Sequence, residues 1–127
     1  MNTAISPPSI APPAAAYAHA VLSTGPAELL HTSGVVPVGP DRSVPSTLEE
    51  QAAVVWANLA AILADAGMAA TDVVSVTTYV VAGEPLGPVM AARDRFMQGH
   101  LAASTLVTVP ALARAEWRLE VALVAAR

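Results

Sequence analysis

The sequence predicts one α+β domain with the element order β-β-(β)-α-β-α-β-β. Three observations lead to this prediction. A chain of 127 residues fits a single domain. Two stretches repeat apolar residues at helical spacing, and several short stretches are rich in β-branched residues. Each helix joins two strands of one mixed sheet, and because such crossovers are right-handed, both helices should cover the same face.

The N-terminal part is expected to hold a leader and two or three short strands. We expect a flexible, Pro-rich leader over residues 1–15 and a single domain over residues 16–127. Residues Tyr17–Leu22 alternate in the manner of a first strand, and Leu29–Ser33 form a second. Residues Val35–Val38 lie between two glycines, which fits either a bent continuation or a hairpin partner.

The first helix is expected from about Thr47 to Ala66. Ser46 and Glu49 have the spacing of a capping box, and Gly67 is placed to end the helix in a left-handed conformation. The residues that form its apolar face recur every three or four positions: Ala52, Val55, Leu59, Ile62, Leu63 and Ala66.

A central strand and a second helix follow. Residues Asp72–Val81 are rich in β-branched side chains and have no helical period, which indicates a strand. Pro88 suits the first turn of a helix, and Gly99 closes it. The inner face of this helix is expected to consist of Val89, Ala92, Phe96 and Met97.

Two strands complete the predicted sheet, at Thr105–Val109 and Trp117–Ala125. In the first of them we expect Thr105 to face the helices, with Leu106 and Thr108 on the opposite face beside Ser104. The same alternation places Glu120 and Ala122 on the face without helices.

The face without helices is expected to be covered by other copies of the chain. Only 13% of the residues are charged, against roughly 25% in typical domains, and 54% are hydrophobic. The residues that we place on this face include Val21, Leu106 and Ala122, which are too apolar to be left in water. The composition therefore predicts a homo-oligomer.

Several kinds of chemistry are excluded by residue types that the chain lacks. It has no Cys, and its six basic residues are all Arg, which rules out a thiolate nucleophile, a Cys-ligated metal and a Schiff-base lysine. The three histidines show no ligand spacing on one element, so we expect no metal. No cofactor is expected either.

Charge and hydropathy argue against nucleic acid and membrane as partners. The net charge is −4, and the close pair Arg93 and Arg95 flanks Asp94, which we interpret as a solvated helix face. The longest apolar run, Ala52–Ala64, is shorter than the roughly 20 residues of a spanning helix. The first charge is Glu28, so no basic n-region of a signal peptide is present, and we expect a cytoplasmic protein.

Several segments, in order and with near-matching spacing, resemble one family. The chain is similar to the YjgF/RidA family, also called reactive intermediate deaminases and, on older labels, L-PSP endoribonucleases, over about residues 14 to 126. The segments that carry the resemblance are Ala16–Val21 (Ala-Tyr-Ala-His-Ala-Val), Thr32–Pro37 (Thr-Ser-Gly-Val-Val-Pro), Gln51 with Asn58–Leu63 and Ala66-Gly67, Asp72–Val80, Val107–Leu112 and Leu119-Glu120-Val121.

The resemblance implies a subunit of the chorismate-mutase-like fold (bacillus type). It also implies a homotrimer whose sheets form a central barrel, with three clefts between neighbouring subunits. In the best-known branch of the family, each cleft hydrolyses enamines and imines such as 2-aminoacrylate to ammonia and a 2-keto acid. A small-molecule metabolite is therefore the expected partner.

Three polar cleft positions of that branch differ in this sequence. The Arg that holds the substrate carboxylate aligns with Ser104, an Asn of the second helix aligns with Met90, and a carboxylate of the last strand aligns with Ala122. No Arg lies between Arg95 and Arg114, so a shift of the alignment by one residue does not restore it. We expect a more apolar cleft, unsuited to holding 2-aminoacrylate by its carboxylate.

The resemblance and the strand pattern together give the candidate site residues. Substrate binding is expected from Tyr17, Ser33, Gly34, Met90, Ser104, Thr105, Leu106 and Ala122. The catalytic candidates are Tyr17, His19, Ser104 and Glu120. The alternatives are that Tyr17 and His19 only fill an interface, that Ser104 is a small residue that opens the cleft, and that Glu120 is structural.

The predicted function is hydrolysis or tautomerisation of an enamine, an imine or a related metabolite that is larger and less polar than 2-aminoacrylate. The alternative is a non-catalytic trimer that binds or senses a metabolite in the same clefts. A ribonuclease, which the older family label suggests, is disfavoured by the acidic charge.

Overall fold

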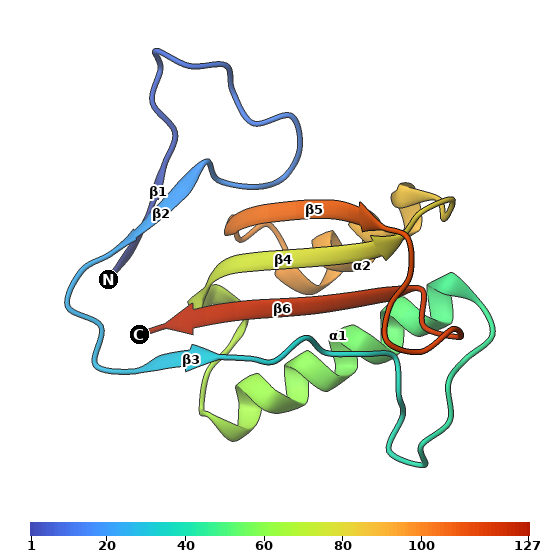
Figure 1. Ribbon diagram of the computed structural model, residues 1–127. Helices are drawn as coiled ribbons and strands as arrows, with labels where there is room; N and C mark the ends of the chain where they lie inside the picture. Colours follow the sequence, from blue (N-terminus) through green and yellow to red (C-terminus); the bar gives the residue numbers. More distant parts are fainter.

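The computed structural model describes residues 1–127 as a mixed sheet with two helices on one face (Figure 1). The sheet has the strand order β3-β6-β4-β5, in which β4 and β5 are parallel and the other neighbours antiparallel. Its strands are β3 (Leu29–His31), β4 (Val73–Val81), β5 (Ala103–Val109) and β6 (Leu119–Ala126). The predicted α+β class and the internal position of β4 are confirmed.

Helix α1 (Leu48–Asp65) follows the predicted apolar period, with two corrections. The residue that caps it is Thr47 rather than Ser46, because the Thr47 hydroxyl accepts the hydrogen bond from the Glu50 N–H at 3.2 Å. Ile62 is 36% exposed and lies outside the core, whereas Trp56 and Gln51 are buried. Gly67 has φ +68° just after the helix, as predicted.

Helix α2 (Leu86–Met97) begins two residues before Pro88, and a short 3-10 turn, η1 (Ala70–Asp72), precedes β4. Val89, Ala92 and Met97 are buried as predicted. Phe96 is partly buried and stacks on Trp56 of α1, with ring centroids 4.8 Å apart.

Arg93 corrects the interpretation of the Arg93-Asp94-Arg95 run as a solvated face. Its side chain is only 8% exposed, whereas Asp94 beside it is 46% exposed. Helical geometry explains the difference, because position 93 lies one turn after the buried Val89 and one turn before the buried Met97.

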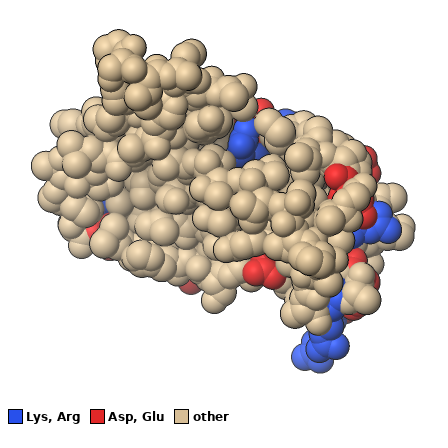
Figure 2. Space-filling view, turned by 45° about the horizontal axis from the view of Figure 1, so that its top comes forward, with Lys and Arg blue, Asp and Glu red and all other residues tan.

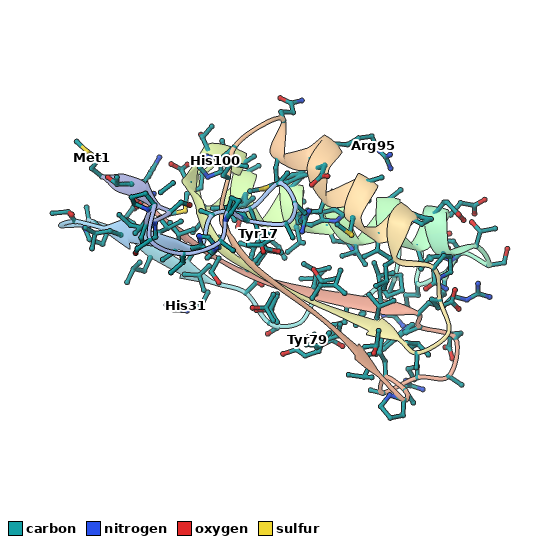
Figure 3. All side chains as sticks on the ribbon, turned by 90° about the horizontal axis from the view of Figure 1, so that it is seen from above. Met1, Tyr17, His31, Tyr79, Arg95 and His100 are labelled. Atoms are coloured by element: carbon teal, nitrogen blue, oxygen red, sulfur yellow. The ribbon has the colours of Figure 1, made fainter.

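The core lies between the helices and one face of β4, β6 and β5. Alternate residues of the two long strands, among them Val76, Val80 and Leu119, are buried there with the inner face of α1. The other face carries Thr77, paired with Ala122, and Tyr79, paired with Glu120. Figure 3 shows Tyr79 on the side of the sheet away from the helices.

We call this second side the uncovered sheet face, formed by Ser75, Thr77, Tyr79, Ala103, Thr105, Val107, Glu120, Ala122 and Val124. Figure 2 looks obliquely across it and shows charged side chains mainly at one end of the molecule. A broad surface with few charges is of the kind that other copies of the chain could cover. That covering stays a prediction.

Strand β5 corrects the predicted orientation of its side chains. Ser104 pairs with the buried Val76, and Leu106 pairs with the buried Thr78, so both lie on the helix side. Leu106 packs against the core. Thr105 is instead on the uncovered sheet face, opposite to the prediction. The strand begins at Ala103 rather than Thr105, and its mixture of Ser, Thr and Val gives no clear alternation.

The N-terminal segment also departs from expectation. Strand β1 (Asn2–Ile5) pairs with β2 (Ala20–Ser23), so four residues of the expected loose leader form regular structure. These two strands form a separate small sheet rather than an edge of the main one (Figure 1). The Asn2 side chain ties it to the end of β6, since its Nδ2 donates to the Ala126 carbonyl at 2.8 Å.

The segment after β3 is a bent continuation along β6 rather than a hairpin partner. Val35 and Val121 exchange backbone hydrogen bonds of 2.7 and 3.0 Å beyond the end of β3. At the other end of the sheet the hydrogen bond from Arg127 to Glu28, 2.7 Å long, raises the pKa of Arg127 above its usual value. Neither helix is long and apolar enough to cross a membrane.

Candidate functional site

A cavity of about 350 Å³ lies beside the start of β5, between that strand, α2 and the N-terminal loop. Its lining residues are Ala14, Ala15, Tyr17, Met90, Arg93, Ser104 and Leu106. The loop is held against β5 by a backbone hydrogen bond of 2.9 Å from the Ala18 N–H to the Ala102 carbonyl. This bond fixes Tyr17 at the cavity although the residue lies outside any regular strand.

Tyr17 has a hydroxyl that can still donate a hydrogen bond. Its oxygen accepts the Ala14 N–H at 3.3 Å, and this bond leaves the phenolic proton free. The ring of His19 meets it edge to face, with centroids 6.3 Å apart. His19 therefore accompanies Tyr17 as predicted but does not line the cavity, and its Nδ1 is buried without a hydrogen-bond partner.

Arg93 is the only charged residue that lines the cavity. Its Nη1 donates to the Ser104 hydroxyl at 3.2 Å, and its Nε donates to the Asp94 carboxylate at 3.0 Å. Its Nη2 lies 3.0 Å from the same Asp94 oxygen, but the angles do not make a hydrogen bond and the atom has no other partner. A guanidinium thus lies beside Ser104, in a region that the sequence analysis expected to be unsuited to holding a carboxylate.

The rest of the lining is apolar. Met90 and Leu106 contribute from α2 and β5, and Ala14 and Ala15 contribute from the loop. This agrees with the expectation of a cleft with much apolar surface. This apolar surface lies next to one fixed positive charge, that of Arg93.

A second group of predicted site residues lies on the opposite side of the sheet. The Glu120 carboxylate packs against Gly34, and both belong to the region where Val35 and Val121 pair. Ser33 and Gly34 are exposed, and their N–H groups make no backbone hydrogen bond. Within one chain these residues, like Thr105 and Ala122, do not line the cavity that contains Tyr17 and Ser104.

The histidines do not form a common centre. His100 is tied to the structure by its Nε2, 2.8 Å from the Val73 carbonyl. His31 lines a small hollow of about 80 Å³ with Thr77 and Ala122. No three His, Asp or Glu side chains lie close enough together to hold a metal ion.

Arg93 was not among the predicted site residues, and the predicted site residues of one chain lie on two sides of its sheet. The signal that could have found Arg93 is its phase in the helix, since Val89 and Met97 were both assigned to the inner face. No comparable signal separates Ser104 from Thr105, because their sides depend on the register with β4.

Residues 9–127 match the family model described as Endoribonuclease L-PSP. YyfB from Yersinia pestis, a protein of unknown function of the conserved Rid family, is 30% identical over 99% of this chain and 98% of its own, with a TM-score of 0.89. None of the curated proteins compared with the chain matches it.

Two proteins of Escherichia coli have the same fold. The YjgF gene product is 28% identical over 87% of each chain, with a TM-score of 0.72. TdcF, solved with bound serine, is 24% identical over 96% of this chain and 93% of its own, with a TM-score of 0.73. At the identity of TdcF the likeness concerns the fold alone.

The two-helix mixed sheet defines a subunit of the chorismate-mutase-like α+β class, as predicted. The chain belongs to the endoribonuclease L-PSP family, the YjgF/RidA family of the sequence analysis.

Proposed function

We propose that this protein hydrolyses an imine or enamine of a small metabolite in clefts between the subunits of a homotrimer, in the cytoplasm. The observation that carries the proposal is the cavity itself. It brings together a phenol that can donate, a guanidinium and a hydroxyl beside an apolar wall. Family membership supports a deaminase type of reaction.

The proposed assembly uses the uncovered sheet face. Thr77, Val107 and Ala122 lie on it, and Val107 is 41% exposed in the single chain. Burying such a face between three copies would stabilise the assembly through the hydrophobic effect. It would also bring Glu120 and Gly34 of one copy toward a cleft of its neighbour, which accounts for site residues on two sides of one sheet.

The chemistry that the residues support is addition of water to a C=N bond. An enamine first takes a proton on carbon and becomes the imine. Water then adds to the imine carbon, the nitrogen takes a proton, and ammonia leaves as the carbonyl forms. In the proposal the Tyr17 hydroxyl donates to the nitrogen, and Glu120 of a neighbouring copy accepts a proton from water.

The proposed substrate is larger and less polar than 2-aminoacrylate. The support is the lining by Met90, Leu106 and two alanines, which suits an aliphatic or aromatic substituent. The proposal aligns Ser104 with the Arg that holds the substrate carboxylate in the best-known branch of the family. Because the Arg93 guanidinium lies beside Ser104, this alignment does not argue against a substrate that carries a carboxylate.

A second candidate is a trimer that binds a metabolite without converting it. The observation that favours it is that no carboxylate and no histidine lines the cavity of the single chain. TdcF, which shares the fold, has been solved with bound serine, so a small amino acid can occupy a protein of this shape.

Trapping of imines separates the two candidates. An L-amino-acid oxidase generates imines from alanine, leucine or phenylalanine, and semicarbazide captures what survives. We expect the protein to lower the semicarbazone yield more with leucine and phenylalanine, whose side chains are large, than with alanine, and a heat-denatured sample to have no effect. An unchanged yield with every amino acid, together with binding of the corresponding 2-keto acids, would establish the binder instead.

A further inference from the structure

We propose that Arg93 holds the carboxylate of the ligand, so that helix α2 supplies the positive charge that strand β5 does not. This inference rests on the proposed function only in that the cavity binds a small metabolite. It does not require that the metabolite be hydrolysed. It commits to an organic acid with an apolar substituent.

The Arg93 guanidinium is buried. The Arg93 side chain is 8% exposed, and a charged group out of water is costly unless it is paired and hydrogen-bonded. Its counter-ion is Asp94, the next residue in the chain, which is 46% exposed. Such a pair at the edge of solvent compensates the buried end of the guanidinium only in part.

Arg93 also has N–H groups that make no hydrogen bond. A guanidinium has five N–H groups, and in this structure one of them binds Asp94 and one binds Ser104. Nη2 is buried and makes no hydrogen bond. One N–H group on Nη1 and both on Nη2 make no hydrogen bond, although Nη2 lies 3.0 Å from the Asp94 carboxylate. One N–H from each of these two nitrogens is the pair that a planar carboxylate accepts with its two oxygens.

The cavity that Arg93 lines holds no compensating negative charge. Arg93 lines the same cavity as Tyr17 and Ser104, and no acidic side chain lines it. An anion is therefore the ligand group that this site attracts, whereas an amine would be repelled. The neighbouring Met90 and Leu106 leave apolar space for the remainder of the molecule.

Ser104 is a positioning residue in this account. Its hydroxyl accepts a hydrogen bond from Nη1 at 3.2 Å, and Asp94 accepts one from Nε at 3.0 Å. Two of the three guanidinium nitrogens are therefore held in place. A guanidinium fixed in advance loses little conformational freedom when a carboxylate binds. A larger residue at position 104 would occupy the space where Nη1 lies.

The experiment measures binding of 4-methyl-2-oxopentanoate and of its neutral amide by calorimetry. The variants are Arg93→Met, Arg93→Lys, Ser104→Ala and, as a matched control, Arg95→Met, since Arg95 is exposed on the same helix. Circular dichroism confirms that each variant folds.

We expect the wild-type protein and Arg95→Met to bind the acid about tenfold or more tightly than the amide. Arg93→Met should lose that preference. Arg93→Lys should lose most of it, because an ammonium cannot donate two parallel hydrogen bonds to a carboxylate. Ser104→Ala should weaken binding of the acid severalfold. Equal affinities of wild type and Arg93→Met for the acid, or no binding of the acid by the wild type, would overturn the inference.

The outcome is separable from that of the trapping assay. Binding of the acid through Arg93 without any loss of imine would leave the inference standing and reject hydrolysis. Loss of imine that persists unchanged in Arg93→Met would support hydrolysis and overturn the role of Arg93.

Discussion

The Glu120 carboxylate packs directly against Gly34, in the space that a Cβ on residue 34 would occupy. Gly34 has no positive φ, so its need for glycine comes from this close approach rather than from its backbone conformation. The contact joins the bend after β3 to the uncovered sheet face and fixes where the Glu120 carboxylate lies. In the proposed trimer this carboxylate serves the cleft of a neighbouring copy.

Gly34→Ala should therefore be coupled to Glu120. The new methyl group collides with the carboxylate, which must swing away, and we expect a loss of stability of about 1 kcal/mol. In a Glu120→Ala background the same substitution should cost much less, because the obstructing group is gone. Urea unfolding of the four proteins measures the coupling, and an equal cost in both backgrounds would show that the contact is unimportant.

Gln51 should be among the most sensitive polar residues. It is 1% exposed, its Nε2 donates to the carbonyls of Pro45 and Glu116, and its Oε1 accepts the Arg118 N–H. Gln51→Leu leaves three partly buried backbone groups without these hydrogen bonds, for a loss of about 1 to 3 kcal/mol in the free energy of unfolding. Chemical denaturation measures this loss. The exposed neighbour Glu50 provides the control, since Glu50→Ala should change stability little, and equal effects of the two would contradict the assignment.

The uncovered sheet face should control assembly. Ala122→Arg puts a charge at the centre of this face, opposite Thr77, without touching the core. Sedimentation should give three times the 12.9 kDa chain mass for the wild type and the mass of one chain for this variant. Ala53→Arg, on the exposed side of α1, should leave the trimer intact. A wild-type protein that sediments as a monomer would refute the assembly.

Exchange of Arg93 and Ser104 tests whether binding needs only a guanidinium in the cavity or one that comes from α2. Arg93→Ser should weaken binding of 4-methyl-2-oxopentanoate about tenfold or more. Addition of Ser104→Arg to that variant returns a guanidinium to the same cavity from β5, and we expect affinity to recover about threefold or more. Calorimetry measures both steps. A double variant that binds no better than Arg93→Ser would mean that the lost affinity was not due to the charge.

The elements with strong local signals could be predicted from the sequence. The apolar period of α1, the glycine after it and the β-branched run of β4 each depend on neighbouring residues. The observed capping residue differs by one position from the predicted one, because Ser46 and Thr47 both carry a hydroxyl. Only the geometry shows that Thr47 accepts the hydrogen bond from the Glu50 N–H.

Features that depend on distant pairing could not be predicted. Strand β1 has only four residues, too few to show a period, and it pairs with the distant residues 20–23. The side taken by each residue of β5 is set by its parallel register with β4. Arg93 was misassigned because the charges at 94 and 95 suggested a solvated surface, although the helical phase placed it inside.

The measurement that tests the central claim most directly is removal of the leucine-derived imine by wild type, Arg93→Met and Arg95→Met. Each is added to an amino-acid oxidase and semicarbazide, and the semicarbazone is followed over time. The account predicts that wild type and Arg95→Met lower its yield and that Arg93→Met does not. A yield that none of the three proteins changes, or that all three lower equally, would contradict the account.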